Sequence, residues 1–200
     1  MTYKFPKIIG LVARSRSGKD TVADYIISKY GVGVGVSSTI EIETHNTYNI
    51  VKRRLAGPIK NAVKELYGFT DMHLETDLKD IKIDAFNCSP RDVMVTVTKA
   101  IMELSGTDFF TNRLYNSITQ EKSINPEITI IPDVRYMHDI ERIHQNGGIV
   151  IKIERNTENN VYYKNENNIE NMDADFIIIN NGTLEELFIK VDNIIATFVF

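Results

Sequence analysis

The sequence of 200 residues contains a single cysteine, Cys88. One thiol cannot form a disulfide within the chain, and it cannot build a zinc site that needs several cysteines. We therefore interpret Cys88 as an ordinary thiol in a protein of a reducing compartment, and we expect a cytoplasmic location.

Long apolar runs are also absent. The longest strongly apolar stretches, such as FIIIN at 176–180 and IIATFVF at 194–200, are far shorter than the roughly 20 residues of a membrane helix. No signal peptide precedes them. The sequence thus predicts a soluble protein with no membrane partner.

Positive charge is not in excess. The chain has 23 Lys and Arg residues against 27 Asp and Glu residues, which gives a net charge of −4. General affinity for nucleic acid relies on a positive field, so we expect no nucleic-acid partner. Any anion must instead be bound by a local cluster of cations.

Short apolar runs alternate with helical patterns along most of the chain. The run at 7–12 is typical of a buried strand, and the helical spacing after it ends at Gly31. Further strand patterns lie at 127–135, 149–154 and 174–180, and further helical patterns at 137–148 and 181–198. The alternation predicts an α/β fold with a parallel sheet and helices on both faces. The last helix is expected to bury Leu184, Leu187, Phe188, Val191 and Ile195.

The stretch ARSRSGKDT at 13–21 is nearly a phosphate-binding loop, with Ala13 in place of the first glycine and Asp20 in place of Ser or Thr. In such a loop, backbone N–H groups surround the β-phosphate and a lysine reaches the β and γ oxygens. Gly18 and Lys19 meet these needs, and Ala13 is compatible if its φ stays negative.

Other side chains of this stretch add to the interpretation. Asp20 could hold Mg²⁺, Thr21 offers a hydroxyl, and two arginines add positive charge. A polar turn between strand and helix is the alternative, but the strand before and the helix after favour a nucleoside triphosphate site. The candidate contacts are Arg14, Ser15, Arg16, Ser17, Gly18, Lys19, Asp20 and Thr21.

A second helix start lies in LAGPIKNAVKELYG at 55–68. Lys60 falls in its first turn, where the helix macrodipole disfavours a cation by up to about 1 kcal/mol. An anion would remove that conflict, so we expect Lys60 to bind a second phosphate, with a solvated lysine as the alternative. The helix is expected to end at Gly68 and to bury Ile59, Ala62, Val63, Leu66 and Tyr67.

A third feature is IIPDVR at 130–135. Asp133 follows an apolar strand, where an acidic residue could hold the water shell of a metal ion. Arg135 could bridge a transferring phosphoryl group. An aspartate in this place is otherwise a turn or cap residue.

The motifs RSRSGKDT, LAGPIK, GTD, PDVRYMHD and NNGTLEELF occur in this order and together resemble the deoxynucleoside monophosphate kinases of tailed bacteriophages. The resemblance extends from about residue 8 to residue 195. It implies a P-loop kinase fold related to adenylate kinase, which passes the γ-phosphoryl of ATP to a deoxynucleoside monophosphate with Mg²⁺. It also implies small-molecule nucleotide partners and the host cytoplasm, and it leaves a homodimer open.

The resemblance assigns roles to residues of this chain. Gly18, Lys19 and Thr21 would hold ATP. Lys60, Asp133 and Arg135 would serve the acceptor phosphate and the metal, for which Asp20 is the other candidate ligand. The residues expected to act on the transferring group are Lys19, Arg16, Asp133 and Arg135, and those expected near the donor base are Asn181 and Gly182.

The chain departs from the family pattern in two places. The family often has an arginine seven residues before the glycine of GTD. This chain has Lys99 at that position, and Arg91 is the other candidate for binding the acceptor phosphate. Lysine keeps the charge but lacks the planar fork of arginine. Of the arginine motif that the family has after a late strand, only Arg155 remains. We expect it to lie in a flap over the phosphates. The choice between Arg91 and Lys99 stays open, as does the acceptor base.

We expect one P-loop kinase domain over 1–200, with a core at 1–57 and 125–200, a helical acceptor-side region at 58–120 and an Asn-rich flap at about 155–172. The Gly-rich stretch 31–47 is expected to be a loop, hairpin or insertion. Three alternatives remain: a phosphomevalonate-kinase-like enzyme, a GTP-binding switch, for which the sequence has no guanine motif, and a non-catalytic nucleotide-binding module.

Overall fold

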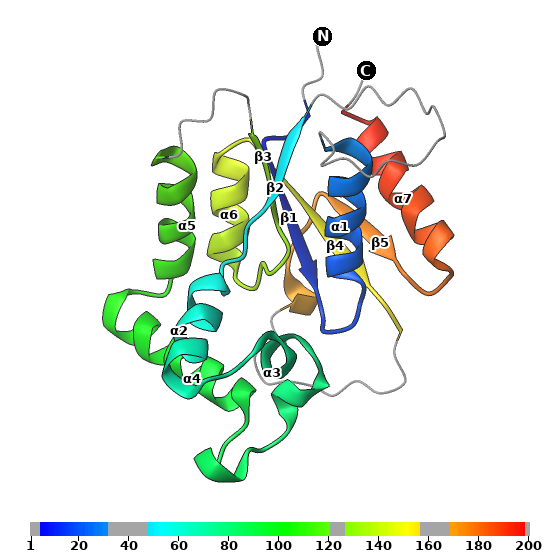
Figure 1. Cartoon of the computed structure of the whole chain (residues 1–200). Coiled ribbons are helices and arrows are strands. Elements are labelled where there is room, and N and C mark those ends of the chain that lie inside the picture. Colours follow the sequence, from blue (N-terminus) through cyan, green and yellow to red (C-terminus); the bar gives the residue numbers. More distant parts are fainter. Residues whose placement is uncertain (1–4, 32–47, 121–126, 157–168, 199–200) are drawn as a thin grey trace. The chain divides into compact units, whose positions relative to one another are not determined.

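A computed structural model describes residues 5–31, 48–120, 127–156 and 169–198 (Figure 1). The chain forms two compact units. Unit 1 consists of Met1–Arg54 and Glu121–Phe200, and unit 2 is the continuous segment Leu55–Gln120. Among the helices of the described residues, none has the length and apolar character needed to cross a membrane.

Unit 1 is built on a five-stranded sheet in the order β2-β3-β1-β4-β5, and every paired neighbour is parallel. This arrangement confirms the predicted α/β fold. The strands are β1 (Ile8–Ala13), β2 (Asn49–Lys52), β3 (Glu127–Ile131), β4 (Ile149–Glu154) and β5 (Phe176–Ile179). Four of them follow the sequence pattern, whereas β2 was not predicted.

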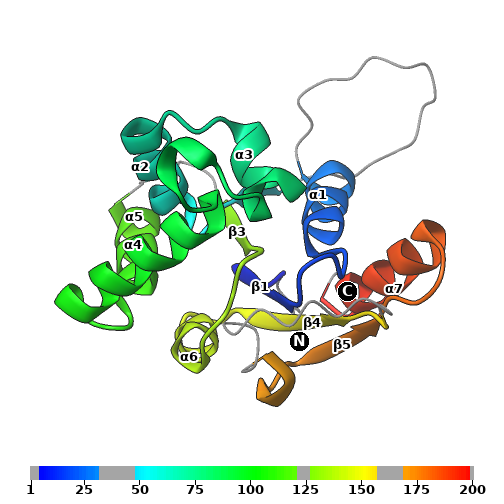
Figure 2. The ribbon, with the colours of Figure 1, turned by 90° about the horizontal axis from the view of Figure 1, so that it is seen from below.

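Helices cover both faces of the sheet, as Figures 1 and 2 show. Helices α1 (Lys19–Tyr30) and α7 (Leu184–Ala196) lie together on one face, and α6 (Met137–Gln145) lies on the other. A short 3₁₀ turn, η3 (Ile169–Asn171), precedes β5. Strand β1 is buried throughout, and its sequence IIGLVA is accordingly a continuous apolar run.

Side chains alternate along β1 between the two helical layers. Ile9 and Leu11 belong to the core beneath α1 and α7 and are fully buried. Gly10 faces the opposite way, where an added Cβ would lie only 2.4 Å from the Ile143 Cδ1 atom of α6. The missing side chain therefore lets α6 pack closely on the sheet.

A carboxylate on α7 joins it to α1. Asp192 accepts hydrogen bonds from Tyr25 Oη at 2.9 Å, Tyr30 Oη at 2.6 Å and Lys29 Nζ at 2.6 Å. Burial acts to raise the pKa of Asp192, but the bonds from Lys29, Tyr30 and Tyr25 outweigh it and hold the pKa below its ordinary value. Tyr25 also stacks on Phe188, with ring centroids 3.9 Å apart.

Unit 2 is helical. Its elements are α2 (Gly57–Tyr67), α3 (Asp71–Glu75), η1 (Asp77–Asp80), η2 (Asp84–Phe86), α4 (Pro90–Ser105) and α5 (Phe109–Gln120). Helix α4 begins with a capping box, in which the Ser89 hydroxyl accepts from Asp92 N–H while the Asp92 carboxylate accepts from Ser89 N–H at 3.0 Å. The buried core consists of Ile59, Val63, Phe69, Leu74 and Val93.

The predicted burial of three helical side chains is wrong. Ala62 and Leu66 of α2 are exposed, Leu66 by 71%, and Leu184 at the start of α7 is 56% exposed. Helical spacing identifies the apolar stripe of a helix, but the width of the stripe that is covered depends on the neighbouring elements. The predicted end of α2 is confirmed, because the helix stops before Gly68, whose φ is 67°.

Candidate functional site

The predicted phosphate-binding stretch joins the carboxyl end of β1 to the amino end of α1, as expected. We call residues 14–18 the phosphate loop. Ser17 N–H donates to the Arg14 carbonyl at 3.3 Å, and Gly18 then takes a left-handed φ of 96° as the residue before α1. Ala13 does not have a positive φ, which confirms that it is compatible with the loop.

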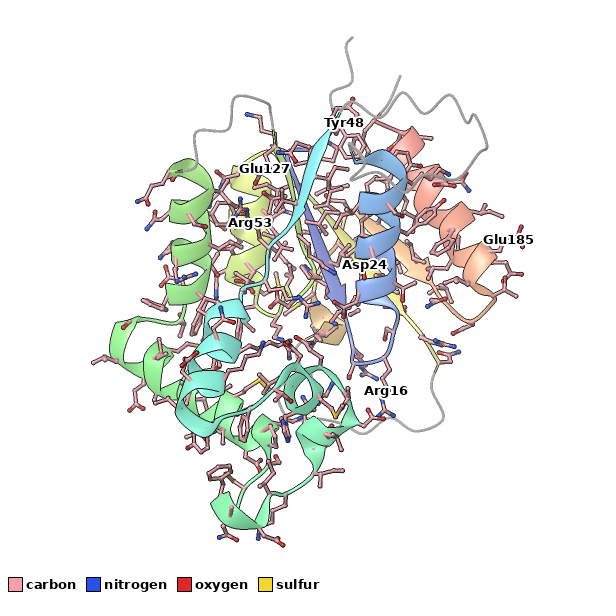
Figure 3. All side chains as sticks on the ribbon, viewed as in Figure 1. Arg16, Asp24, Tyr48, Arg53, Glu127 and Glu185 are labelled. Carbon is pink, nitrogen blue, oxygen red and sulfur yellow. The ribbon has the colours of Figure 1, made fainter. Side chains whose placement is uncertain are left out.

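Arg16 is the unusual residue of the phosphate loop. It has a φ of 65°, a conformation that costs a non-glycine residue about 1 kcal/mol or more, and it is exposed at the turn after β1 (Figure 3). Left-handed residues interspersed in a turn bring successive backbone N–H groups onto one side and create an anion-binding concavity. The free N–H groups at the start of α1 add to it. The loop can therefore bind a phosphate.

Three charged side chains meet beside this loop. The Asp20 carboxylate is bonded to Lys19 Nζ through one oxygen and to Arg54 Nη2 through the other, the latter at 2.8 Å. Burial acts to raise the pKa of Asp20, but the hydrogen bond from Lys19 and the charges of Lys19, Arg54 and Lys52 outweigh it and lower the pKa. Asp20 is thus kept ionised, as a metal ligand must be.

Sequence reasoning missed Arg54. The signal available was the basic run Lys52-Arg53-Arg54, but its meaning depends on β2, which the sequence did not reveal. The run leaves the carboxyl end of β2, so it arrives at the same edge of the parallel sheet as the phosphate loop. Lys52 pairs with Asp24 of α1.

Arg53 of the same run holds β2 to β3. Its Nη2 and Nε atoms donate to Glu127 Oε1 at 2.8 and 3.2 Å, and both side chains are largely covered (Figure 3). Its backbone N–H also donates to the Ile130 carbonyl at 2.9 Å. The pair fixes the strand that carries Arg54.

The turn after β3 carries Asp133 and Arg135, again at this edge of the sheet. Both residues are half-buried. The buried Asp139 carboxylate accepts from the Arg135 and Tyr136 N–H groups at 3.1 and 3.0 Å, which fixes the backbone after the turn. Because β3 pairs directly with β1, the structure brings this turn and the phosphate loop to neighbouring strand ends.

The strand ends of β4 and β5 supply the remaining candidates of unit 1. Arg155 is exposed directly after β4. Asn181 Oδ1 accepts from the Asn156 N–H at 2.8 Å, so this predicted base contact already has a backbone partner. An added Cβ on Gly182 would lie 1.6 Å from Oε2 of Glu186, an exposed residue that takes part in the capping box of α7. Most of the expected flap, 157–168, and the stretch 32–47 lie outside the described residues.

Asn180 was not predicted as a site residue. It follows β5, and its Nδ2 atom donates to the carbonyl of Ser17 in the phosphate loop at 2.9 Å. The two residues are 6% and 3% exposed. A contact between residues so far apart in the sequence leaves no local pattern that could have revealed it.

In unit 2, the acceptor-side candidates all lie on helices. Lys60 is in the first turn of α2, as predicted, and its Nζ pairs with Glu75 at 2.6 Å. On α4, Arg91 pairs with Asp80 while Lys99 is exposed. Eight residues of α-helix separate Arg91 from Lys99 by about 12 Å along the axis.

A metal site made of protein ligands alone is not found within the described ranges, where no three His, Cys, Asp or Glu side chains converge. Mg²⁺ is often held by one or two carboxylates together with substrate phosphates and water. Ionised Asp20, next to a loop suited to phosphate, fits that kind of site.

Comparison with known proteins identifies one family. The family model described as deoxynucleotide monophosphate kinase matches residues 82–191. The deoxynucleotide monophosphate kinase of enterobacteria phage T4 is 25% identical, and the match covers 94% of this chain and 98% of that protein. A protein of Acanthamoeba polyphaga mimivirus, provisionally named as the same kinase, is also 25% identical over 92% of this chain and 93% of its own length.

Proposed function

The chain belongs to the deoxynucleotide monophosphate kinase family, and from this premise we propose that it transfers the γ-phosphoryl group of ATP, with Mg²⁺, to a deoxynucleoside 5′-monophosphate. It is a nucleotide kinase that acts on small-molecule nucleotides. The observation that carries the proposal is the phosphate loop itself, with its left-handed Arg16 and Gly18 and with Lys19 at the start of α1.

The donor triphosphate is proposed to bind at the phosphate loop. The N–H groups of the loop and of the first turn of α1 receive the β-phosphate, and Thr21 offers its hydroxyl nearby. Lys19 is paired with Asp20 in this structure, so it must exchange that carboxylate for the phosphate oxygens when the donor binds. Arg54 remains to balance the charge of Asp20.

Asp20 and Asp133 are the proposed residues for Mg²⁺, directly or through water. The ion would neutralise negative charge on the β and γ oxygens. Burial acts to raise the pKa of Asp20 and Lys19 lowers it, and Arg54, which holds the other carboxylate oxygen, adds to the lowering.

The proposed cations for the acceptor phosphate are Arg135 in unit 1 and, in unit 2, Lys60 with Arg91 or Lys99. A phosphate oxygen is already a nucleophile, so the transfer needs orientation and charge stabilisation rather than a dedicated base. Arg16 and Arg155 are the proposed cations for the charge that spreads over the transferring group. Lys60 and Arg91 would have to exchange their present carboxylate partners, Glu75 and Asp80, for the ligand.

The test is turnover by the purified full chain. ATP and Mg²⁺ are offered with each deoxynucleoside monophosphate and, separately, with phosphomevalonate, while ADP release is followed. We expect ADP release that depends on a deoxynucleoside monophosphate and that falls by orders of magnitude in Lys19→Ala. Turnover with phosphomevalonate alone, or none with any acceptor, would overturn the proposal.

A further inference from the structure

The side-chain amide of Asn180 holds the backbone of the phosphate loop through a hydrogen bond to the Ser17 carbonyl. Its Nδ2 atom donates to the Ser17 carbonyl at 2.9 Å, in a buried position. Its own backbone N–H donates to the Glu154 carbonyl of β4 at 2.7 Å, so the residue is fixed to the sheet. The bond therefore ties the phosphate loop to the rigid end of the β4-β5 pair.

Asn180 also fits the shape of the loop. A Cβ added to Gly18 would lie 2.7 Å from Asn180 Nδ2, closer than a real Cβ atom approaches such an atom. The amide thus occupies the space that a side chain at position 18 would need. Gly18 and Asn180 are complementary, and this contact adds to the left-handed φ of 96° as a reason for glycine.

The bond has a directional consequence. The peptide group between Ser17 and Gly18 is planar, and none of the described peptide bonds is cis. The carbonyl and the N–H of a trans peptide point in opposite directions. Because the Ser17 carbonyl is held toward Asn180, the Gly18 N–H is held away from it, toward the opposite side of the loop.

We infer that Asn180 is a positioning residue for the donor phosphates: it sets the orientation of the Ser17–Gly18 peptide in the loop that receives them. The inference rests on the proposed function, because it requires the loop to bind a triphosphate. Asn181, the neighbour of Asn180, accepts from the N–H of Asn156 and so holds the segment after β4 to the segment after β5. The paired asparagines thus connect the loops that follow β1, β4 and β5.

A purely stabilising hydrogen bond would have a different signature. Losing it would lower the melting temperature, but the folded protein would keep its preference for phosphorylated ligands. Losing a positioning bond weakens the contribution of the phosphates to binding in protein that is still folded. The two roles are separated by comparing ligands with and without phosphates.

The experiment uses Asn180→Asp and Asn180→Ala in the full chain. Aspartate keeps the shape but places a carboxylate against the Ser17 carbonyl, and alanine removes the donor. The control is Asn146→Asp, because Asn146 Nδ2 also donates to a backbone carbonyl, that of Arg142 at 2.7 Å on α6. Calorimetry gives the dissociation constants of adenosine and of a non-hydrolysable ATP analogue, at a temperature where circular dichroism shows folded protein.

We expect the ratio of the adenosine constant to the ATP-analogue constant to fall about tenfold to a hundredfold in both Asn180 variants, as expected when the Gly18 N–H no longer donates a well-aligned hydrogen bond to a charged phosphate. The ratio should be unchanged in Asn146→Asp. An unchanged ratio in a folded Asn180 variant would overturn the inference and leave the proposed function intact. A parent protein with no preference for the ATP analogue would overturn both, and failure of both variants to fold would make Asn180 a folding determinant only.

Discussion

Replacing Asp192 with asparagine tests whether one carboxylate holds α1 against α7. Asp192 receives bonds from two tyrosines and Lys29, and its side chain is 29% exposed. Hydrogen bonds to a charged group contribute about 1.5–3 kcal/mol each when covered, whereas exposed ion pairs contribute about 0–1 kcal/mol. Because asparagine keeps one acceptor oxygen, we expect Asp192→Asn to lower the free energy of unfolding by about 2–3 kcal/mol in all.

The pH dependence of this loss follows from the lowered pKa of Asp192. A carboxyl with a lower pKa in the folded state stabilises the fold above its unfolded pKa of about 3.9, and the contribution is lost as pH falls through the folded value. The difference between parent and variant should therefore be full at pH 7 and shrink below about pH 4.

The assay is urea unfolding at pH 7 and at pH 3, followed by far-UV circular dichroism because the chain has no tryptophan. The matched control is Asp24→Asn on α1, whose carboxylate is 62% exposed and pairs with Lys52. Its loss should be below about 1 kcal/mol. An Asp192→Asn loss no larger than that of the control, or one that is equally large at pH 3, would refute the reasoning.

Three further predictions concern charged side chains. Asp20→Ser should keep much of the activity, whereas Asp20→Ala should raise the Mg²⁺ concentration needed for half-maximal rate; an alanine variant as active as the parent at low Mg²⁺ contradicts the metal assignment. Lys60→Ala should raise the acceptor KM about ten- to a hundredfold and leave ATP-analogue binding unaltered. The control is Lys64→Ala, one turn along α2 and paired with Asp71, which should change neither quantity. If Lys60→Ala weakens ATP-analogue binding and leaves the acceptor KM unchanged, the two substrates are misassigned. Arg53→Gln leaves the largely covered Glu127 without its partner and should cost about 1–3 kcal/mol in urea unfolding, and a loss below about 0.5 kcal/mol would show that the pair is not structural.

The sequence predicted the parts of the fold whose signals are local. The strand β1, the phosphate loop and α1 follow one another within residues 8–30, and each is marked by its own pattern. Strand β2 was not predicted because it is short and has no long apolar run. It has four residues at the edge of the sheet, and only Ile50 is buried.

The candidate site shows the same division. Lys19 and Gly18 could be proposed from a motif, because phosphate loops are continuous in sequence. The contacts of Asn180 with Ser17 and of Arg54 with Asp20 join residues 163 and 34 positions apart. Such pairs depend on the order of strands in the sheet, which spacing along the chain does not give.

The central place of β1 in the sheet has a consequence for the order in which the chain folds during synthesis. Its two neighbours are β3 and β4, which begin at Glu127 and Ile149, so β1 leaves the ribosome more than a hundred residues before either partner. The continuous unit 2, with its own core, can form in that interval. Such long-range pairing is slow, so the apolar segment IIGLVA has no strand partner until β3 has been synthesised. The hydrogen bond that Asn180 donates to Ser17 of the phosphate loop can form only after residue 180 has been synthesised.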